Sequence, residues 1–201
     1  MRGLYLVTPN WDNTEQLLAV TEQALQAGVA LLQYRHKHAG EELRQSQASA
    51  LLVLARRYGV PLIINDHLEL CEELGADGLH VGGTDMTVAE ARARLGPDRI
   101  VGASCYGELA LARAAQAGGA SYVAFGGFYP SLVKQYPVTT PPGIVEQARR
   151  ELGVPVVVIG GMTPDNAAPL VARGADMVAA ISSVMQASDV VAAVQKFNAL
   201  F

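Results

Sequence analysis

Short apolar runs in this chain end repeatedly in polar residues, at the point where a helical pattern begins. The run 62–64 is followed directly by Asn65 and Asp66, and the run 100–103 is followed by Ser104. A parallel strand buried on both faces is continuously apolar, so its polar residues belong at its end. Because one strand after another does this at the same end, these ends are expected to share one face. In a (β/α)8 barrel that face carries the active site.

The spacing of apolar residues predicts about eight βα units, the number that closes a single-domain (β/α)8 TIM barrel over residues 1–201. The predicted strands lie near 4–8, 31–35, 62–65, 78–81, 100–105, 122–127, 156–161 and 177–182. The predicted helices lie near 14–27, 41–58, 67–74, 87–95, 107–117, 142–152, 163–173 and 186–199. Glycine ends several of these helices just before a strand, as at Gly28, Gly75, Gly119 and Gly174. An open doubly wound sheet is the alternative fold.

Composition narrows the class of protein. Half of the residues are hydrophobic and 17% are charged, which suits a sheet covered by helices. The net charge of −4 gives no general attraction to nucleic acid or to an anionic membrane, so a bound anion needs a local cluster of cations. Cys71 and Cys105 show no disulfide or metal-ligand spacing, and the apolar start of the chain is short. We therefore expect a cytoplasmic protein.

The end of the second predicted strand carries a candidate anion site. Gln33, Arg35 and Lys37 lie on one side of an extended segment, because side chains alternate along a strand. A planar guanidinium, an ammonium and an amide at one place could hold a diphosphate. The alternative is an ordinary solvated strand end followed by a basic loop.

Two carboxylates at neighbouring strand ends are candidate ligands of Mg²⁺. Asp66 follows the third predicted strand, and Asp85 follows the fourth by a few residues. Mg²⁺ takes oxygen ligands and keeps water or substrate oxygens in its remaining positions. In the alternative interpretation, Asp66 and Asp85 cap the helices that begin at His67 and Met86. The histidines lack the spacing of a zinc helix and are interpreted as surface or strand residues.

The last strands predict a phosphate site. Gly160 and Gly161 end the seventh predicted strand, Thr163 can cap the next helix, and Pro164 suits its first position. Backbone N–H groups at such a helix start face an incoming anion. Ile181-Ser182-Ser183 ends the following strand, and barrels often bind phosphate after strands seven and eight. Residues 126–134, glycine-rich at first and ending in Lys134, suit a loop that folds over a phosphorylated ligand; tight turns and an ordinary surface loop are the alternatives.

Taken together, these segments resemble the thiamine phosphate synthase family over nearly the whole chain. The residues that carry the resemblance are, in order, Gln33 to Lys37, Asn65-Asp66, Gly75-Ala76-Asp77-Gly78 with His80, Gly82 and Asp85, Ser104, Gly126 to Lys134, Ile159-Gly160-Gly161 and Ile181-Ser182. The resemblance implies a transferase that joins a hydroxymethylpyrimidine diphosphate to a thiazole phosphate and releases pyrophosphate.

The resemblance also implies roles for individual residues. Mg²⁺ would be bound by Asp66 and Asp85. The pyrimidine diphosphate would be held by Gln33, Arg35, Lys37, Asn65, Ser104 and Lys134, of which Arg35, Lys37, Ser104 and Lys134 are the catalytic candidates. The thiazole phosphate would be held by Ser131, the Leu132-Val133 backbone, Gly161, Ile181 and Ser182. Such a reaction needs charge stabilisation on the leaving group and a well-placed nucleophile more than it needs a general base.

Three residues depart from the family pattern. Val133 stands where threonine is usual, Gly83 where glutamine is frequent, and Gly127 where proline is usual. Because one hydroxyl is missing at Val133, we expect weaker or rearranged binding of the thiazole phosphate, with the reaction retained.

Other functions remain as alternatives. A related thiazole tautomerase shares the phosphate site but has a histidine after the strand that holds Ser104, where this chain has Cys105-Tyr106-Gly107. A non-catalytic phosphate-binding barrel and another phosphate-handling barrel enzyme are the further alternatives. Mg²⁺-dependent pyrophosphate release from both substrates separates the synthase from the tautomerase and the binding protein. The sequence leaves open whether the chain forms a homodimer.

Overall fold

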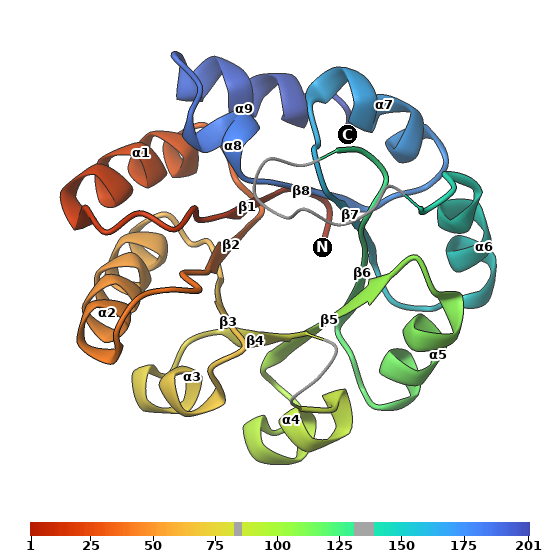
Figure 1. Cartoon of the computed structure of the whole chain (residues 1–201), viewed down its shortest axis with the longest axis horizontal. Coiled ribbons are helices and arrows are strands. Elements are labelled where there is room, and N and C mark those ends of the chain that lie inside the picture. The colour runs from red at the N-terminus through yellow and green to blue at the C-terminus, as the bar shows by residue number, and fades with distance from the viewer. Residues whose placement is uncertain (83–85, 131–138) are drawn as a thin grey trace.

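The chain forms a closed barrel of eight parallel strands, which lie in sequence order and are surrounded by helices (Figure 1). The computed structural model describes residues 1–82, 86–130 and 139–201. The strands are β1 (Gly3–Val7), β2 (Leu31–Tyr34), β3 (Leu62–Asn65), β4 (Gly78–Val81), β5 (Ile100–Tyr106), β6 (Tyr122–Phe125), β7 (Val156–Ile159) and β8 (Met177–Ala180). β1 pairs with both β2 and β8. The barrel prediction is therefore confirmed, and the doubly wound alternative is wrong.

The helices follow the strands around the ring. They are α1 (Thr14–Gln26), α2 (Glu41–Arg57), α3 (Leu68–Leu74), α4 (Val88–Leu95), α5 (Leu109–Ala117), α6 (Gly143–Glu151), α7 (Pro164–Ala172), α8 (Ser182–Met185) and α9 (Val190–Asn198). The last predicted helix, 186–199, is wrong at its start. A short turn of helix, α8, directly follows β8, and α9 begins only where the Asp189 side chain accepts a hydrogen bond from the Ala192 N–H.

Two apolar clusters build the protein. The larger one lies between the sheet and the helices, and the smaller one fills the inside of the barrel. The inner cluster contains Tyr5 of β1 and Tyr122 of β6, whose rings meet edge to face with centroids 5.6 Å apart. Aromatic pairs favour this geometry. Two hydroxyl groups are thus placed inside an apolar barrel, where they need hydrogen-bond partners.

Three polar residues at strand starts join neighbouring strands. The side chain of Asp77 accepts a hydrogen bond from the Leu62 N–H, and that of Asp176 accepts one from the Val156 N–H. Ser121 does the same for Val101. The Gly-Ala-Asp and Gly-Ala-Ser junctions of the sequence therefore link β3 to β4, β5 to β6 and β7 to β8.

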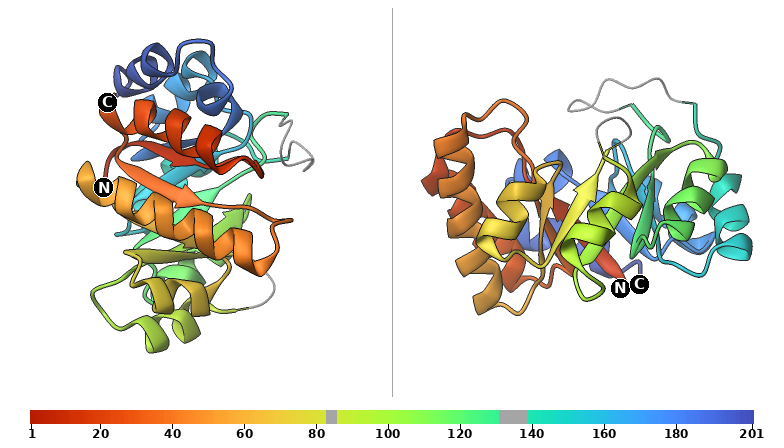
Figure 2. Two further views of the ribbon diagram at one scale, coloured as in Figure 1. Left: turned by 90° about the vertical axis from the view of Figure 1, so that its left-hand side faces the viewer. Right: turned by 90° about the horizontal axis from the view of Figure 1, so that it is seen from below.

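The two chain ends lie together on one face of the barrel (Figure 2). The Arg2 guanidinium donates to the Phe201 carbonyl oxygen at 3.2 Å and lies over the Phe201 ring. The strands begin on this face and end on the opposite one, so the described residues predicted for the site lie at the other end of the barrel from both chain termini.

Candidate active site

β2 brings two of the predicted anion ligands to the mouth of the barrel. Gln33 and Arg35 are both 4% exposed, whereas Lys37 is exposed to solvent. The backbone of Arg35 is held by Thr8, which directly follows β1: the Thr8 hydroxyl accepts from the Arg35 N–H at 2.8 Å and donates to the Arg35 carbonyl at 3.1 Å. The arginine is thus fixed from a neighbouring strand.

The loop after β1 makes two more contacts with the loop after β2. The Asn10 side chain accepts from the Lys37 N–H at 3.1 Å, and His36 Nε2 lies 3.0 Å from Asp12 Oδ1. His36 is buried and lies outside the strands, so the interpretation of every histidine as a surface or strand residue is wrong for this one. The backbone at Lys37 and the His36 side chain are therefore held by the loop after β1. This differs from the freely solvated strand end considered above.

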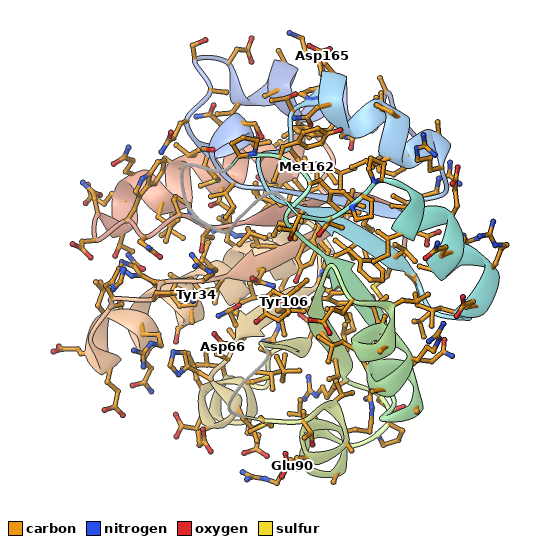
Figure 3. The ribbon with its side chains drawn as sticks, turned by 45° about the vertical axis from the view of Figure 1, so that its right-hand side comes forward. Tyr34, Asp66, Glu90, Tyr106, Met162 and Asp165 are labelled. Carbon is orange, nitrogen blue, oxygen red and sulfur yellow. The ribbon has the colours of Figure 1, made fainter. Side chains whose placement is uncertain are left out.

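Asp66 has an unusual backbone at the end of β3. Its φ of 62° is in the left-handed region, which side chains other than glycine, asparagine and aspartate rarely adopt. Its carboxylate accepts from the Gly82 N–H at 3.2 Å and from Asn65 Nδ2 at 2.6 Å. α3 begins two residues later, and its N-cap is His67 without a side-chain cap bond. The capping interpretation of Asp66 is therefore wrong, and its exposed carboxylate remains a candidate metal ligand (Figure 3).

The second predicted metal ligand, Asp85, lies outside the described residues. The helix expected to start at Met86 begins instead at Val88, because Thr87 and Glu90 form a capping box that fixes its first turn. Among the described residues no group of three His, Cys, Asp or Glu side chains could hold a metal ion. Of the two predicted metal ligands, Asp66 is the one that the structure describes, and one carboxylate fits an Mg²⁺ site that water and substrate oxygens complete.

A cavity of about 240 Å³ brings the predicted residues of β2 and β3 together. Its lining contains Lys37, Asn65 and Asp66, together with Tyr34, His36 and His67. Burial lowers the pKa of His67, and the positive charge of Arg44 lowers it further. An uncharged imidazole therefore lies next to the exposed ammonium and carboxylate of this cavity.

Ser104 lies on β5 immediately before an irregularity in the strand. The register with β6 shifts between Ser104 and Tyr106, and Tyr106 has a φ of 51°. Bulges of this kind are common beside active sites, where they re-aim a side chain. The Ser104 hydroxyl is 2.9 Å from Nε2 of His80, which lies on the adjacent strand β4.

The turn between β7 and α7 has the features predicted for phosphate binding. Thr163 caps α7 through a reciprocal pair of bonds with Asn166, and Pro164 is its first residue. Gly161 has a φ of 62°, and a Cβ there would lie 2.1 Å from the Pro130 carbonyl oxygen. Only glycine therefore allows the segment after β6 to approach this turn so closely.

The segment after β6 is fastened at its two ends. The Gly127 carbonyl accepts from the N–H groups of Thr139 and Thr140, at 3.1 and 3.2 Å. The Tyr129 hydroxyl donates to the Asn166 carbonyl at 3.0 Å. Three predicted site residues, Ser131, Val133 and Lys134, lie outside the described residues. At the end of β8, Ile181 packs against the inner cluster, and Ser182 begins α8.

With this geometry in view, the chain matches the family model described as thiamine monophosphate synthase over residues 4–184. The protein belongs to the thiamine monophosphate synthase family. It is 65% identical over 201 residues to a thiamine-phosphate synthase of Janthinobacterium sp. (strain Marseille), covering 100% of this chain and 97% of that protein. It is 50% identical over 199 residues to a thiamine-phosphate synthase of Thiobacillus denitrificans, covering 99% and 94%.

A solved structure gives the same result. The thiamine phosphate pyrophosphorylase of Pyrococcus furiosus superposes with a TM-score of 0.85 at 29% identity, covering 98% of this chain and 94% of that one. The match extends over the whole barrel, so this family member keeps the family fold throughout.

Several residues that support the site were missed from sequence. Thr8, Asn10 and Asp12 look like an ordinary turn around Pro9, and Tyr5 and Tyr122 look like core residues. Their contacts join strands far apart in the chain, so no local pattern could reveal them. His80 was visible within the family motif, but its two hydrogen bonds were not.

Proposed function

We propose that this protein is a thiamine-phosphate synthase. It condenses 4-amino-2-methyl-5-(diphosphooxymethyl)pyrimidine with a thiazole phosphate to give thiamine phosphate and pyrophosphate. The observation that carries the proposal is the full-length identity of 65% to a protein of that name. The cavity that is lined by Lys37, Asn65 and Asp66 supports it.

The proposed reaction is dissociative. The bond between the pyrimidine methylene carbon and the diphosphate oxygen breaks, and the oxygen keeps the electron pair. The pyrimidine ring stabilises the resulting carbocation, and the lone pair of the thiazole nitrogen forms the new carbon–nitrogen bond. Negative charge therefore grows on the diphosphate as the transition state is reached.

The cations of the site are proposed to stabilise that charge. The backbone of Arg35 is fixed by Thr8 and its side chain is buried, so this cation is kept at the mouth before the substrate arrives. Preorganised charge of this kind stabilises a transition state without a reorganisation cost. Lys37 and Lys134 would add point charges, and Gln33, Asn65 and Ser104 would add hydrogen bonds to the pyrimidine diphosphate.

The proposed enzyme is Mg²⁺-dependent, with Asp66 and Asp85 as the protein ligands. Bound Mg²⁺ would neutralise charge on the diphosphate oxygens. The left-handed backbone of Asp66 supports this role, because such conformations collect at functional sites.

The thiazole phosphate is proposed to bind at the far side of the mouth. Its ligands would be the backbone near Gly161 and Ile181, with the hydroxyls of Ser182 and Ser131. The start of α7 supports this through its dipole, because the N-terminus of a helix favours a bound anion. The capping box already satisfies the N–H groups of Thr163 and Asn166. The residue after Leu132 is Val133, so we expect modest affinity for this substrate.

The whole chain, residues 1–201, is proposed to act as one catalytic domain in the cytoplasm, on small-molecule substrates. No helix of the described residues is long and apolar enough to cross a membrane.

The proposal is tested by incubating the purified protein with both substrates and Mg²⁺ and measuring pyrophosphate. We expect release only when both substrates and the metal are present, with loss of release on chelation. A thiazole tautomerase or a binding protein would release none. Isomerised thiazole phosphate without pyrophosphate would replace the synthase assignment with the tautomerase.

Lys134→Ala provides a second test of the same chemistry. We expect turnover to fall by about a hundredfold to a thousandfold, because one charge partner of the leaving group is lost. Binding of the thiazole phosphate should hardly change. Unchanged single-turnover release with weakened thiazole phosphate binding would place Lys134 at the other phosphate.

A further inference from the structure

A continuous chain of hydrogen bonds crosses the inside of the barrel. Gln33 Nε2 donates to the Tyr5 hydroxyl at 2.6 Å, and this hydroxyl is 2.6 Å from that of Tyr122. The Tyr122 hydroxyl is 2.9 Å from Nδ1 of His80, and Nε2 of His80 is 2.9 Å from the Ser104 hydroxyl. Its two ends are residues proposed to hold the pyrimidine diphosphate. The three middle residues have no role in the proposed chemistry.

The middle of the chain is closed to water. Tyr5 and Tyr122 are at most 1% exposed, and His80 is 7% exposed. Burial raises the pKa of both tyrosine hydroxyls far above 10.0, so each keeps its single hydrogen. A buried hydroxyl or imidazole without a partner is costly, so these hydrogens are constrained to lie along the chain.

These single hydrogens give the chain a direction. When the Gln33 amide donates to Tyr5, the chain is satisfied throughout if the Tyr5 hydroxyl donates to Tyr122 and the Tyr122 hydroxyl donates to Nδ1 of His80. The His80 ring then carries its hydrogen on Nε2 and donates it to Ser104. The Ser104 hydroxyl accepts this bond, which leaves its own hydrogen for a ligand.

The reversed chain would have the opposite consequences. Ser104 would donate to His80, and Gln33 would accept from Tyr5 through its carbonyl oxygen. The two ends are therefore coupled: the orientation of one amide decides whether a hydroxyl on the far side of the barrel is a donor or an acceptor.

The backbone makes room for this chain at a defined place. A Cβ on Gly102 of β5 would lie 2.0 Å from Cζ of Tyr122, so only glycine allows the Tyr122 ring to reach the barrel axis. The His80 and Tyr122 rings also stack, with centroids 5.7 Å apart and 21° between their planes. Packing thus fixes the Tyr122 ring, whose hydroxyl joins the two halves of the hydrogen-bond chain.

We propose that Tyr5, Tyr122 and His80 are positioning residues that fix the hydrogen-bonding direction of Gln33 and Ser104. Ser104 is held as a donor, which matches a diphosphate oxygen, and Gln33 is held with its carbonyl oxygen available to an amino group. This inference rests on the proposed function, because it takes both end residues as ligands of the aminopyrimidine diphosphate.

Tyr122→Phe tests the positioning role. The variant keeps the ring that packs against Gly102 and removes the hydroxyl that joins the two halves. We expect kcat/KM for the pyrimidine diphosphate to fall about ten- to hundredfold, as when a residue supporting a ligand side chain is lost. The KM for the thiazole phosphate should stay unchanged.

Tyr58→Phe is the matched control. Its hydroxyl also has two side-chain partners, Gln26 and Glu22, but lies at the end of α2 that is remote from the mouth. We expect wild-type kinetics from this variant. Equal kinetics for Tyr122→Phe and Tyr58→Phe, or a loss in Tyr122→Phe that affects both substrates alike, would overturn the positioning role.

The direction of the chain has a readout that needs no activity. The protein has four histidines, so ¹⁵N-histidine labelling gives a spectrum in which His80 is identified by its absence from a His80→Gln sample. We expect the hydrogen on Nε2 and a bare Nδ1 in the wild-type protein, and loss of this preference in Tyr122→Phe. A hydrogen on Nδ1 in the wild type would overturn the proposed direction. Absence of pyrophosphate release by the wild type would instead remove the proposed function, and the tautomer would still decide the direction of the chain.

Discussion

The hydroxyl group of Thr8 bonds to both backbone polar groups of Arg35. It accepts from the N–H at 2.8 Å and donates to the carbonyl oxygen at 3.1 Å, in a place where both residues are buried. The last residue before the first loop thereby fixes the backbone that presents the proposed diphosphate ligand. The backbone position of Arg35 is therefore set by contacts within the protein, between the ends of two adjacent strands.

Thr8→Val should therefore weaken both stability and diphosphate binding. Valine has nearly the same shape but leaves the two Arg35 groups without this partner, at a cost of about 1–3 kcal/mol in the free energy of unfolding. We expect a lower melting temperature and a higher KM for the pyrimidine diphosphate. Thr21→Val is the control, since the Thr21 hydroxyl is buried without a hydrogen-bond partner among the described residues. Equal effects of both variants would contradict the role of Thr8.

Asp66→Asn should abolish most pyrophosphate release while the fold persists. Asparagine also tolerates the left-handed backbone, and it keeps an oxygen for the Gly82 N–H. One altered hydrogen bond to Asn65 should change the free energy of unfolding by only about 0.5–1.5 kcal/mol. Mg²⁺ titration of activity and thermal unfolding separate the two effects. Asp98→Asn is the control, because Asp98 is exposed and lies between α4 and β5, at the end of the barrel remote from the mouth. Full activity with the usual metal response would exclude Asp66 as a ligand.

Gly161→Ala should weaken the thiazole phosphate site selectively. A side chain at a φ of 62° costs about 1–3 kcal/mol, and its Cβ would displace the Pro130 carbonyl. We expect a raised KM for the thiazole phosphate, measured with saturating pyrimidine diphosphate. Gly143→Ala is the control, because a Cβ there meets nothing within 4 Å. An equal rise of KM for both substrates would show a general disturbance of the barrel.

Stability should decrease at alkaline pH. Burial raises the pKa of Cys71 to about 11 and that of Cys105 to about 12, from an ordinary value of 9.0. Between pH 9 and these raised pKa values, the unfolded chain loses thiol protons that the folded chain keeps, so the free energy of unfolding falls as pH rises. We expect denaturant midpoints to fall from about pH 9 upwards. The midpoint should fall less steeply with pH in the double variant Cys71→Ala/Cys105→Ala. Equal pH dependence in the variant and the wild type would assign the loss of stability to the buried tyrosines alone.

The sequence alone determined the class of fold and the end of the barrel at which the candidate site lies. Continuous apolar runs alternating with helical periodicity allow a parallel sheet covered on both faces, and eight such units close a barrel. Polar residues at the carboxyl ends of the strands then necessarily share one face. The position of a residue along a parallel strand also sets its height along the barrel axis. The pattern therefore placed Gln33, Arg35, Asn65 and Ser104 near the carboxyl ends of the strands. The cap of α7 was equally local, since Thr163 and Asn166 are three residues apart.

The tertiary structure decided which of these side chains are held, and by what. Asp66 could have been a helix cap or a metal ligand from its sequence context, and only its left-handed backbone and the bond from Gly82 exclude the cap. Thr8 and Arg35 are 27 residues apart, and Tyr5 and Tyr122 are 117 apart. A local pattern reports what a residue does to its own helix or strand, whereas these contacts exist only because barrel closure brings separate strands within hydrogen-bond distance. The sequence therefore set the residues at the mouth, and the closed barrel set the hydrogen bonds that orient them.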